Sequence, residues 1–262
     1  HPRWSWDGGR NSRIFGRGCT TPSPGTVTTP NGGERAARSP SVSMQRPNAS
    51  FKLEVMLHEL SLPGVFLAKP TVHSDERGTF QEWFKASTFE EATGFPLDMQ
   101  QGNLSTSRRG VVRGLHYADV PPGQAKYVTC VAGSIRDVVV DVRLGSPTFG
   151  QHVVVELSAE NRHAVFVPVG FAHGFAALSD ATVMYVTTSE YDPEIERELN
   201  PCDPALAIEW GVAEPIMSEK DVAAVSLADA QSLGVLPTFE ACTEYETMLR
   251  DAWVLANEEA VQ

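Results

Sequence analysis

A histidine and a lysine lie in neighbouring apolar segments near the middle of the chain. His116 lies within Arg113-Gly-Leu-His-Tyr117, and Lys126 follows Gln124-Ala125. Imidazole is suited to moving protons near neutral pH, and an ammonium group stabilises developing negative charge. The turn residues 121–123 lie between them, so the period of two along a strand does not establish a shared face. Two interpretations stay open: a base and a cation in one cavity, or a core histidine and a solvated lysine.

The histidine spacing does not predict a metal centre. Metal-binding β-barrels usually carry two histidines one residue apart, then a carboxylate and a further histidine, whereas Tyr117 and Ala118 follow His116. His173 would bring the total to two histidines, too few for a site of three protein ligands. The sequence also lacks a glycine-rich loop between strand and helix and a G-x-S-x-G elbow. Acid–base chemistry remains, with these candidates: His116, Lys126, Tyr185 and Tyr191.

Charge is distributed unevenly along the 262 residues. The net charge is -12, yet residues 1–50 contain seven arginines and two acids, so the remainder carries -17. Such an acidic body argues against a nucleic-acid-binding domain. No apolar run reaches the length of a membrane span. The four cysteines are widely spaced without a C-x-x-C motif, which predicts reduced thiols in a cytoplasmic protein, although the even number also allows a disulfide.

Short apolar segments separated by Gly and Pro dominate residues 55–190. Strands are expected at 57–68 around Pro63-Gly64, at 126–143 as a hairpin broken at Gly133-Ser134, at 153–157, at 164–175 broken at 168–170, and at 182–188. This pattern predicts an all-β sandwich or barrel. A short helix is expected around 87–94, where Ser87-Thr-Phe-Glu90 has the pattern of a capping box, and another at 226–234. A C-terminal helix is expected where Tyr245, Met248, Leu249 and Trp253 lie at helical spacing and form an apolar packing face.

We divide the chain into three regions on this basis. Residues 1–54 are rich in Gly, Pro, Ser, Thr and Arg and are predicted to be a disordered leader or a non-native extension, with a basic arm or a transit peptide as alternatives. Residues 55–215 form the predicted barrel. Residues 216–262 are predicted to be a C-terminal loop and helices that pack on the barrel.

Several motifs, each at its expected place along the chain, resemble the dTDP-4-dehydrorhamnose 3,5-epimerase family. The resemblance covers residues 56–250. The motifs that carry it are Asp75-Glu-Arg-Gly-Thr-Phe80, Arg113-Gly-Leu-His-Tyr117 with Pro122-Gly-Gln-Ala-Lys126, Asp137-Val-Val-Val-Asp-Val-Arg143 with Leu144-Gly-Ser-Pro-Thr-Phe-Gly150, Phe171-Ala-His-Gly-Phe175, and Asp203-Pro-Ala-Leu-Ala-Ile-Glu-Trp210.

The resemblance implies an isomerase with a cupin-like jelly-roll barrel, working as a homodimer without metal or cofactor. Its substrate would be a dTDP-4-keto-6-deoxyhexose, inverted at C3 and/or C5 next to the C4 ketone, in deoxysugar biosynthesis such as that of dTDP-rhamnose. Three alternatives stay open: a mono-selective 3- or 5-epimerase of a natural-product pathway, a ketoisomerase moving the carbonyl between C3 and C4, and a non-catalytic nucleotide-sugar-binding barrel.

The resemblance also implies roles for single residues. His116 matches the base, Asp221 the carboxylate that orients it, Lys126 the cation at the enolate oxygen and Tyr185 the opposing acid. From the residues alone, Asp221 would be interpreted as a solvated loop acid. Tyr191 resembles a ring that packs on substrate. The other matched positions are Arg77, Gln101, Asn103 and Arg113 for the phosphates and nucleotide, Phe80 and Glu82 for the nucleotide base, and His173, either beside the substrate or structural.

Overall fold

A computed structural model describes residues 55–260. These residues all belong to the unit Ser50–Gln262, one of the two units into which the chain divides. The prediction of a leader or non-native extension at residues 1–54 lies outside the described residues.

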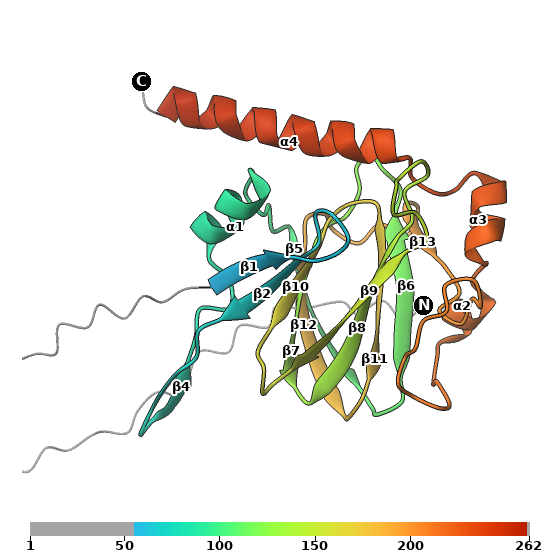
Figure 1. Cartoon of the computed structure of the whole chain (residues 1–262), viewed down its shortest axis with the longest axis horizontal. Helices are drawn as coiled ribbons and strands as arrows, with labels where there is room; N and C mark the ends of the chain where they lie inside the picture. Colours follow the sequence, from blue (N-terminus) through green and yellow to red (C-terminus); the bar gives the residue numbers. More distant parts are fainter. Residues whose placement is uncertain (1–54, 261–262) are drawn as a thin grey trace, which may run out of the picture. The chain divides into compact units, whose positions relative to one another are not determined.

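Two antiparallel sheets face each other (Figure 1). The six-stranded sheet has, in spatial order, β1 (Val55–Glu59), β2 (Phe66–Pro70), β10 (Ala164–Val167), β7 (Lys126–Ala132), β12 (Ala181–Thr187) and β5 (Gln101–Ser107). The five-stranded sheet has β13 (Glu196–Glu198), β6 (Val112–Ala118), β11 (Phe171–Ala177), β8 (Ser134–Asp141) and β9 (His152–Ser158). From β5 to β13 the chain passes repeatedly from one sheet to the other. This is the expected jelly-roll, cupin-like barrel.

The turn predicted as a hairpin at Gly133 and the break predicted at residues 168–170 are both corners between the sheets. Strands β7 and β8 flank Gly133 but lie in different sheets, as do β10 and β11 on either side of residues 168–170. Gly133 and Gly170 have positive φ angles of 71° and 81°, which glycine adopts without the steric penalty of a side chain. The same glycine pattern therefore serves a corner as well as a hairpin, and the hairpin prediction at Gly133 was wrong. The pair β1–β2 is antiparallel as expected.

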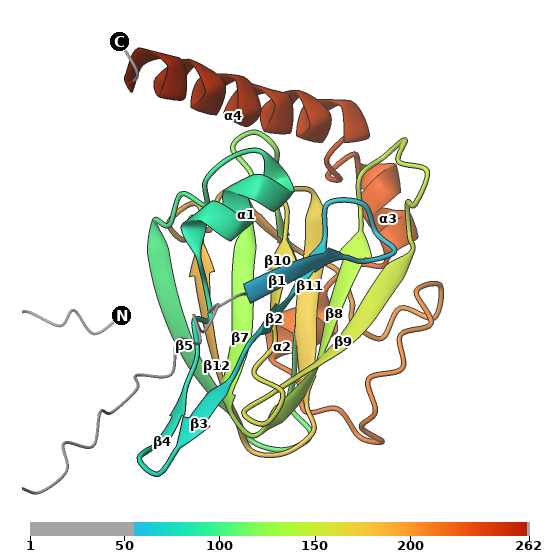
Figure 2. The same ribbon diagram turned by 60° about the vertical axis from the view of Figure 1, so that its left-hand side comes forward.

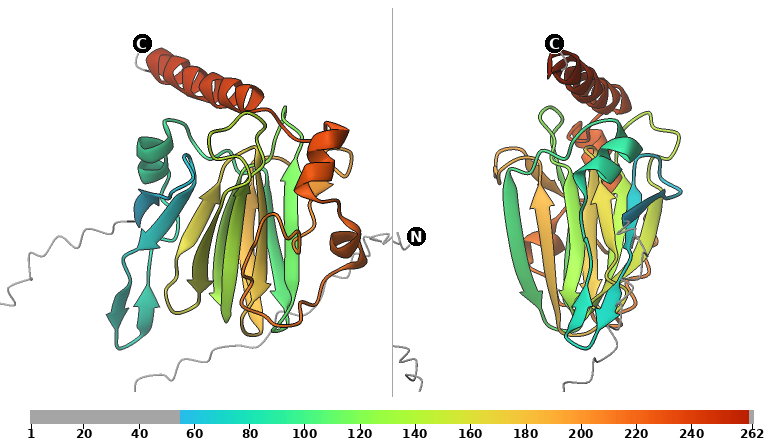
Figure 3. Two further views of the ribbon diagram at one scale, coloured as in Figure 1. Left: turned by 45° about the vertical axis from the view of Figure 1, so that its right-hand side comes forward. Right: turned by 90° about the vertical axis from the view of Figure 1, so that its left-hand side faces the viewer.

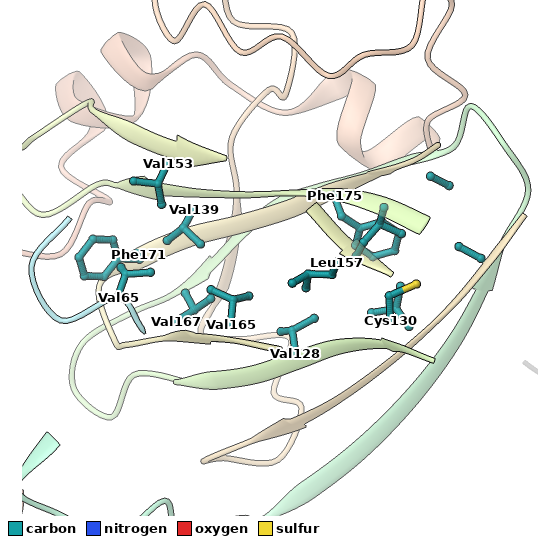
Figure 4. Packing of buried hydrophobic residues seen from close by; sticks show 14 of the residues in the cluster. Val65, Val128, Cys130, Val139, Val153, Leu157, Val165, Val167, Phe171 and Phe175 are labelled. Carbon is teal, nitrogen blue, oxygen red and sulfur yellow. The ribbon is translucent and has the colours of Figure 1, made fainter. Parts of the chain in front are cut away.

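The hydrophobic core fills the space between the sheets, and two further hydrophobic clusters cover the outer faces of the sheets. Figure 4 shows the central cluster, in which Val139 and Phe175 of one sheet meet Val128 and Val165 of the other. A second cluster joins the outer face of β6 and β8 to the segment 199–236. A third cluster joins the six-stranded sheet to residues 83–97 and to the C-terminal helix, and contains a T-shaped pair, Phe89 and Phe166, with ring centroids 4.8 Å apart.

The helices are few and mostly C-terminal, as predicted. They are α1 (Ala86–Thr93), α2 (Glu219–Ala223), α3 (Leu227–Leu233) and α4 (Phe239–Ala260). Ser226 caps α3 by accepting from the Asp229 N–H, and Gly234 ends it with a φ of 69°. The capping box predicted for α1 is not used, because Lys85 occupies the N-cap and Ser87 already lies inside the helix. Among residues 55–260, no helix combines the length and the apolarity needed to cross a membrane.

One helix face was predicted only in part. Tyr245, Leu249 and Trp253 of α4 pack against the third cluster, but Met248, expected on the same face, is 55% exposed. The Arg250 guanidinium reaches the Thr93 carbonyl at the end of α1 at 3.0 Å, and α4 passes above α1 in Figure 2.

A small hairpin, β3 (His73–Asp75) with β4 (Gly78–Phe80), extends away from the two sheets (Figures 2 and 3). Strand β4 ends at Phe80, so Glu82 and Phe84 lie beyond the strand. Beyond the hairpin the chain returns to the barrel at Trp83, whose carbonyl accepts a 2.7 Å hydrogen bond from Tyr127.

Strands β6 and β11 approach each other so closely at Gly114 that one added methyl group should destabilise the fold. Gly114 has a φ of 114°, and a Cβ there would lie 2.6 Å from the Gly174 Cα and 2.7 Å from the His173 carbonyl oxygen. We expect Gly114→Ala to lower the free energy of unfolding by about 3 kcal/mol, because backbone atoms cannot give way. Gly102→Ala, where a Cβ meets open space, is the control and should change it by less than about 1 kcal/mol. Chemical denaturation measures both, and equal effects would contradict the close approach.

Candidate active site

A cavity of about 410 Å³ opens between the two sheets. Phe175 and Val183 belong both to its lining and to the core, so they form its floor. Nine of the residues that the sequence singled out contribute to its lining: Gln101, Asn103, Arg113, His116, Lys126, His173, Tyr185, Tyr191 and Asp221. The two sheets supply different groups. The histidines come from β6 and β11 of the five-stranded sheet, whereas the lysine and Tyr185 come from β7 and β12 opposite.

His116 and Asp221 form a hydrogen-bonded pair. The Nε2 atom of His116 lies 2.8 Å from Oδ1 of Asp221, which comes from a helix 105 residues later. The histidine side chain is 35% exposed, whereas the aspartate is buried. Burial alone raises the pKa of Asp221, but the hydrogen bond and charge of His116, with bonds from Ser218 and the Gly114 backbone, outweigh it and hold that pKa below its ordinary value.

The pair defines which imidazole nitrogen is free. An ionised carboxylate only accepts hydrogen bonds, so the proton between Asp221 and His116 is on Nε2 of the histidine. Nδ1 is then the nitrogen that can take a proton. The short helix α2 positions the aspartate, since the Ser218 hydroxyl caps it by accepting from the Asp221 N–H at 3.1 Å.

Lys126 and Tyr185 lie on neighbouring strands of the opposite sheet. Burial lowers the pKa of Lys126, and the charges of Glu196 and Asp137 counter part of that effect. Burial also raises the pKa of Tyr185, as does Glu196, while Arg113 acts in the opposite direction. The lysine can therefore give up or share a proton more readily than in water, and the tyrosine is held in its protonated form.

A second histidine–aspartate pair lies beside the first. The Nε2 atom of His173 is 2.9 Å from Oδ2 of Asp137, which is fully buried. His173 is paired in register with His116 across β11 and β6, and the register shifts between His173 and Phe175. Register shifts of this kind change the direction of side chains and are frequent next to active sites. Within residues 55–260, Oδ1 of Asp137 has no hydrogen-bond partner.

The polar residues on the rim of the cavity form hydrogen bonds with one another and with neighbouring residues. Gln101 donates to Asn103 Oδ1 at 2.8 Å and accepts from the Tyr191 N–H at 2.9 Å, which ties the loop after β12 to β5. Tyr191 itself is 56% exposed. Arg113 donates from Nε to the Ser107 hydroxyl at 2.9 Å. These contacts leave the Tyr191 ring and part of the Arg113 guanidinium available at the mouth of the cavity.

Three predicted substrate-binding residues lie elsewhere in the chain. Arg77 and Phe80 belong to the β3–β4 hairpin, and Glu82 follows it; none of them lines this cavity. Phe80 is 61% exposed and the Arg77 side chain is 85% exposed. Arg77 is paired with Asp75, and this hydrogen bond lowers the pKa of Asp75. Within one chain, the structure does not bring these residues to the histidine.

Sequence reasoning missed two charged residues of the lining, Glu196 and Lys220. Lys220 forms an ion pair with Glu198, which raises the pKa of Lys220. Lys220 directly precedes Asp221, so its position next to an implied catalytic residue was the available signal. Glu196 carried no such signal, because it lies in an acidic stretch that resembles a solvated loop. Across residues 55–260, no group of three His, Cys, Asp or Glu side chains could hold a metal ion.

Comparisons with known proteins define the class of enzyme. The profile of the dTDP-4-dehydrorhamnose 3,5-epimerase family matches residues 59–229. The chain therefore belongs to this family of isomerases.

Individual relatives differ in the carbon that their names specify. A dTDP-4-dehydrorhamnose 3-epimerase of Streptomyces niveus is 48% identical over 71% of this chain and 90% of that protein. A dTDP-4-dehydrorhamnose 3,5-epimerase of Mycolicibacterium smegmatis is also 48% identical, over 73% of this chain and 96% of that protein. The structure of ChmJ, a 3'-monoepimerase of Streptomyces bikiniensis in complex with dTDP-quinovose, matches with a TM-score of 0.72 and 45% identity, covering 74% of this chain and 98% of that chain.

The lowered pKa of Asp221 predicts a pH-dependent contribution to stability. A carboxylate with a lowered folded pKa stabilises the fold fully above its unfolded pKa of about 4, and this contribution is lost as the pH falls through the folded value. We expect Asp221→Asn to lower the free energy of unfolding by about 1 kcal/mol near neutral pH, with the difference disappearing in acid. Urea titrations at several pH values measure it. Glu219→Gln, an exposed carboxylate of the same helix, is the control. A deficit that is independent of pH would contradict the assignment.

Proposed function

We propose that the protein epimerises a dTDP-4-keto-6-deoxyhexose next to its C4 ketone, using its own side chains as base, cation and acid. One observation carries the proposal: the 2.8 Å His116–Asp221 pair shares a cavity with Lys126 and Tyr185, which come from the opposite sheet. Inversion beside a ketone requires proton removal on one face, a stabilised enolate, and proton delivery on the other face.

His116 acts as the base. Its Nδ1 takes the proton from the carbon next to the ketone, and the C–H bonding electrons move into the enolate. The Asp221 carboxylate stabilises the resulting imidazolium at Nε2 and keeps the ring in the tautomer that leaves Nδ1 free.

Lys126 stabilises the enolate oxygen. Its half-buried side chain lines the cavity, where a charge–charge interaction is stronger than in bulk solution. The nearby charges of Glu196 and Asp137 favour the protonated form against the effect of burial. The lysine can thus donate a hydrogen bond as the ketone becomes an enolate, and weaken that bond as the ketone returns.

Tyr185 delivers the proton on the opposite face. A phenol whose pKa is raised by burial is fully protonated at neutral pH and donates to a carbanion-like carbon. After transfer, the histidine carries one proton more and the tyrosine one fewer, and exchange with solvent restores both. Inversion therefore leaves no net change in the enzyme.

We further propose that the active enzyme is a homodimer in which each β3–β4 hairpin completes the cavity of the other subunit. Phe80 and Arg77 are exposed and do not line the cavity of their own chain, yet the family resemblance assigns them to the nucleotide. A second copy reconciles the two observations. Phe80 then stacks on the nucleotide base, and Arg77 exchanges Asp75 for the diphosphate oxygens, which a guanidinium binds through paired hydrogen bonds.

Hydrogen exchange tests the base and the acid separately. With dTDP-4-keto-6-deoxyglucose in D2O, proton NMR should show loss of signal at C3, C5 or both. His116→Asn should slow this exchange by about 10³-fold, since the base is lost. Tyr185→Phe should retain exchange at the face of His116 but reduce inversion by about 10²-fold.

The carbons that exchange decide between the alternatives. Exchange at both carbons means a 3,5-epimerase, and exchange at one carbon means a mono-selective enzyme. A 3-keto product instead of an inverted centre means a ketoisomerase. Binding of the nucleotide sugar by folded wild-type protein, with no exchange at either carbon, would refute the proposed activity and leave a binding protein.

Mixed dimers test the shared cavity. We expect the homodimer of His116→Asn and that of Arg77→Ala with Phe80→Ala to be weakly active, each for its own reason. Co-expression of the two chains should restore activity, because one cavity of the mixed dimer then has an intact histidine and an intact hairpin. The control carries all three substitutions on one chain, paired with the His116→Asn chain. Mixed dimers as weak as their parents would contradict a shared cavity.

A further inference from the structure

The β3–β4 hairpin needs a contact outside itself to have a defined direction. Each of its strands has three residues, and a two-stranded hairpin of this size is not stable by itself in water. Trp83 fixes the chain where it re-enters the barrel, through the Tyr127 hydroxyl. That contact lies beyond the hairpin and does not determine which way Phe80 points.

Arg162 supplies a contact on the hairpin itself. Its Nη1 donates to the Thr79 hydroxyl at 2.7 Å and to the Gln81 side-chain oxygen at 3.1 Å, across 83 and 81 residues of sequence. Thr79 and Gln81 are two residues apart, so in extended chain they face the same side. Phe80 lies between them and faces the other side, 61% exposed. The guanidinium therefore holds one face of the strand and directs Phe80 outward.

The backbone conformation of the turn fixes the direction of the Arg162 side chain. Arg162 has a φ of 56°, a left-handed conformation that non-glycine residues rarely adopt. Asn161 surrounds this conformation with hydrogen bonds: its side chain accepts from the N–H groups of Ser158 and His163, both at 3.0 Å, and donates to the Glu156 carbonyl at 2.7 Å. Arg162 Nε also donates to the Ala159 carbonyl at 3.3 Å. A rare backbone conformation held by so many bonds points to a requirement for the side chain's direction.

We propose that Arg162 is a positioning residue of the active site, which fixes the β3–β4 hairpin so that Phe80 and Arg77 reach the cavity of a second copy of this chain. The inference rests on the shared cavity of the proposed function. Arg162 itself touches neither substrate nor the reacting atoms. It acts on nucleotide binding alone, because the groups that move protons lie on other strands.

Steady-state kinetics with dTDP-4-keto-6-deoxyglucose test this role. Arg162→Gly removes the guanidinium, and glycine tolerates the positive φ, so the turn is not strained. We expect KM to rise about tenfold, because two hydrogen bonds that orient the hairpin are lost. The kcat and its pH profile should be unchanged. Arg162→Lys should recover part of the loss. Glu160→Ala, an exposed residue of the same turn, is the matched control and should leave KM unchanged.

A double-mutant cycle separates positioning from a general structural role. If Arg162 acts through Arg77 and Phe80, then Arg162→Gly should add almost nothing to the KM of a variant that already carries both Arg77→Ala and Phe80→Ala. Thr79→Val removes an acceptor of the Arg162 hydrogen bonds from the hairpin and should also raise KM. This second variant keeps the test valid even if Arg162→Gly fails to fold. Multiplicative effects, or equal losses in kcat and kcat/KM, would overturn the positioning role.

The outcomes also distinguish this inference from the function on which it rests. If Phe80→Ala raises KM while Arg162→Gly and Thr79→Val do not, Arg162 has no positioning role and the shared cavity stands. If Phe80→Ala leaves KM unchanged in an active enzyme, the shared cavity is wrong and the inference falls with it.

Discussion

The hydrogen bond between His116 and Asp221 is the contact on which the arrangement of the cavity depends. It spans 2.8 Å and joins the five-stranded sheet to a helix that comes after the last strand. The same carboxylate accepts a hydrogen bond from the Gly114 backbone, and the Ser218 hydroxyl caps the helix by accepting from the Asp221 N–H. The segment between β13 and α2 packs against the outer face of the sheet, and this packing delivers the aspartate. The hydrophobic covering of the sheet thus also orients the imidazole.

The pairing of the two sheets explains why one cavity holds groups from distant parts of the chain. A strand presents alternate residues to the two faces, so each sheet contributes its inward residues to the cavity and its outward residues to a covering layer. His116 and Lys126 lie on different sheets. The alternation of residues along a single strand could therefore not predict that both line one cavity. Glu196, on the edge strand β13 of the five-stranded sheet, influences both Lys126 and Tyr185 of the opposite sheet.

The sequence was informative where a local pattern determines structure. Alternating apolar segments predicted the barrel, and Ser226 with Gly234 marked both ends of α3. It was uninformative where placement depends on distant contacts. Asp221 looks like a solvated acid until the fold brings it to a histidine 105 residues away, and α2 is too short for a periodic signal. The glycine turns at 133 and 168–170 are equally compatible with hairpins and corners, because both need positive φ.

The floor of the cavity links selectivity to stability. Phe175 and Val183 belong to the central hydrophobic core, and the same side chains close the bottom of the cavity. Replacing either by a smaller residue deepens the cavity and removes core packing at once, whereas a larger residue strains the sandwich. Adapting the cavity to a ligand of another shape therefore lowers the stability of the fold, and compensating substitutions elsewhere in the core are expected to accompany such a change.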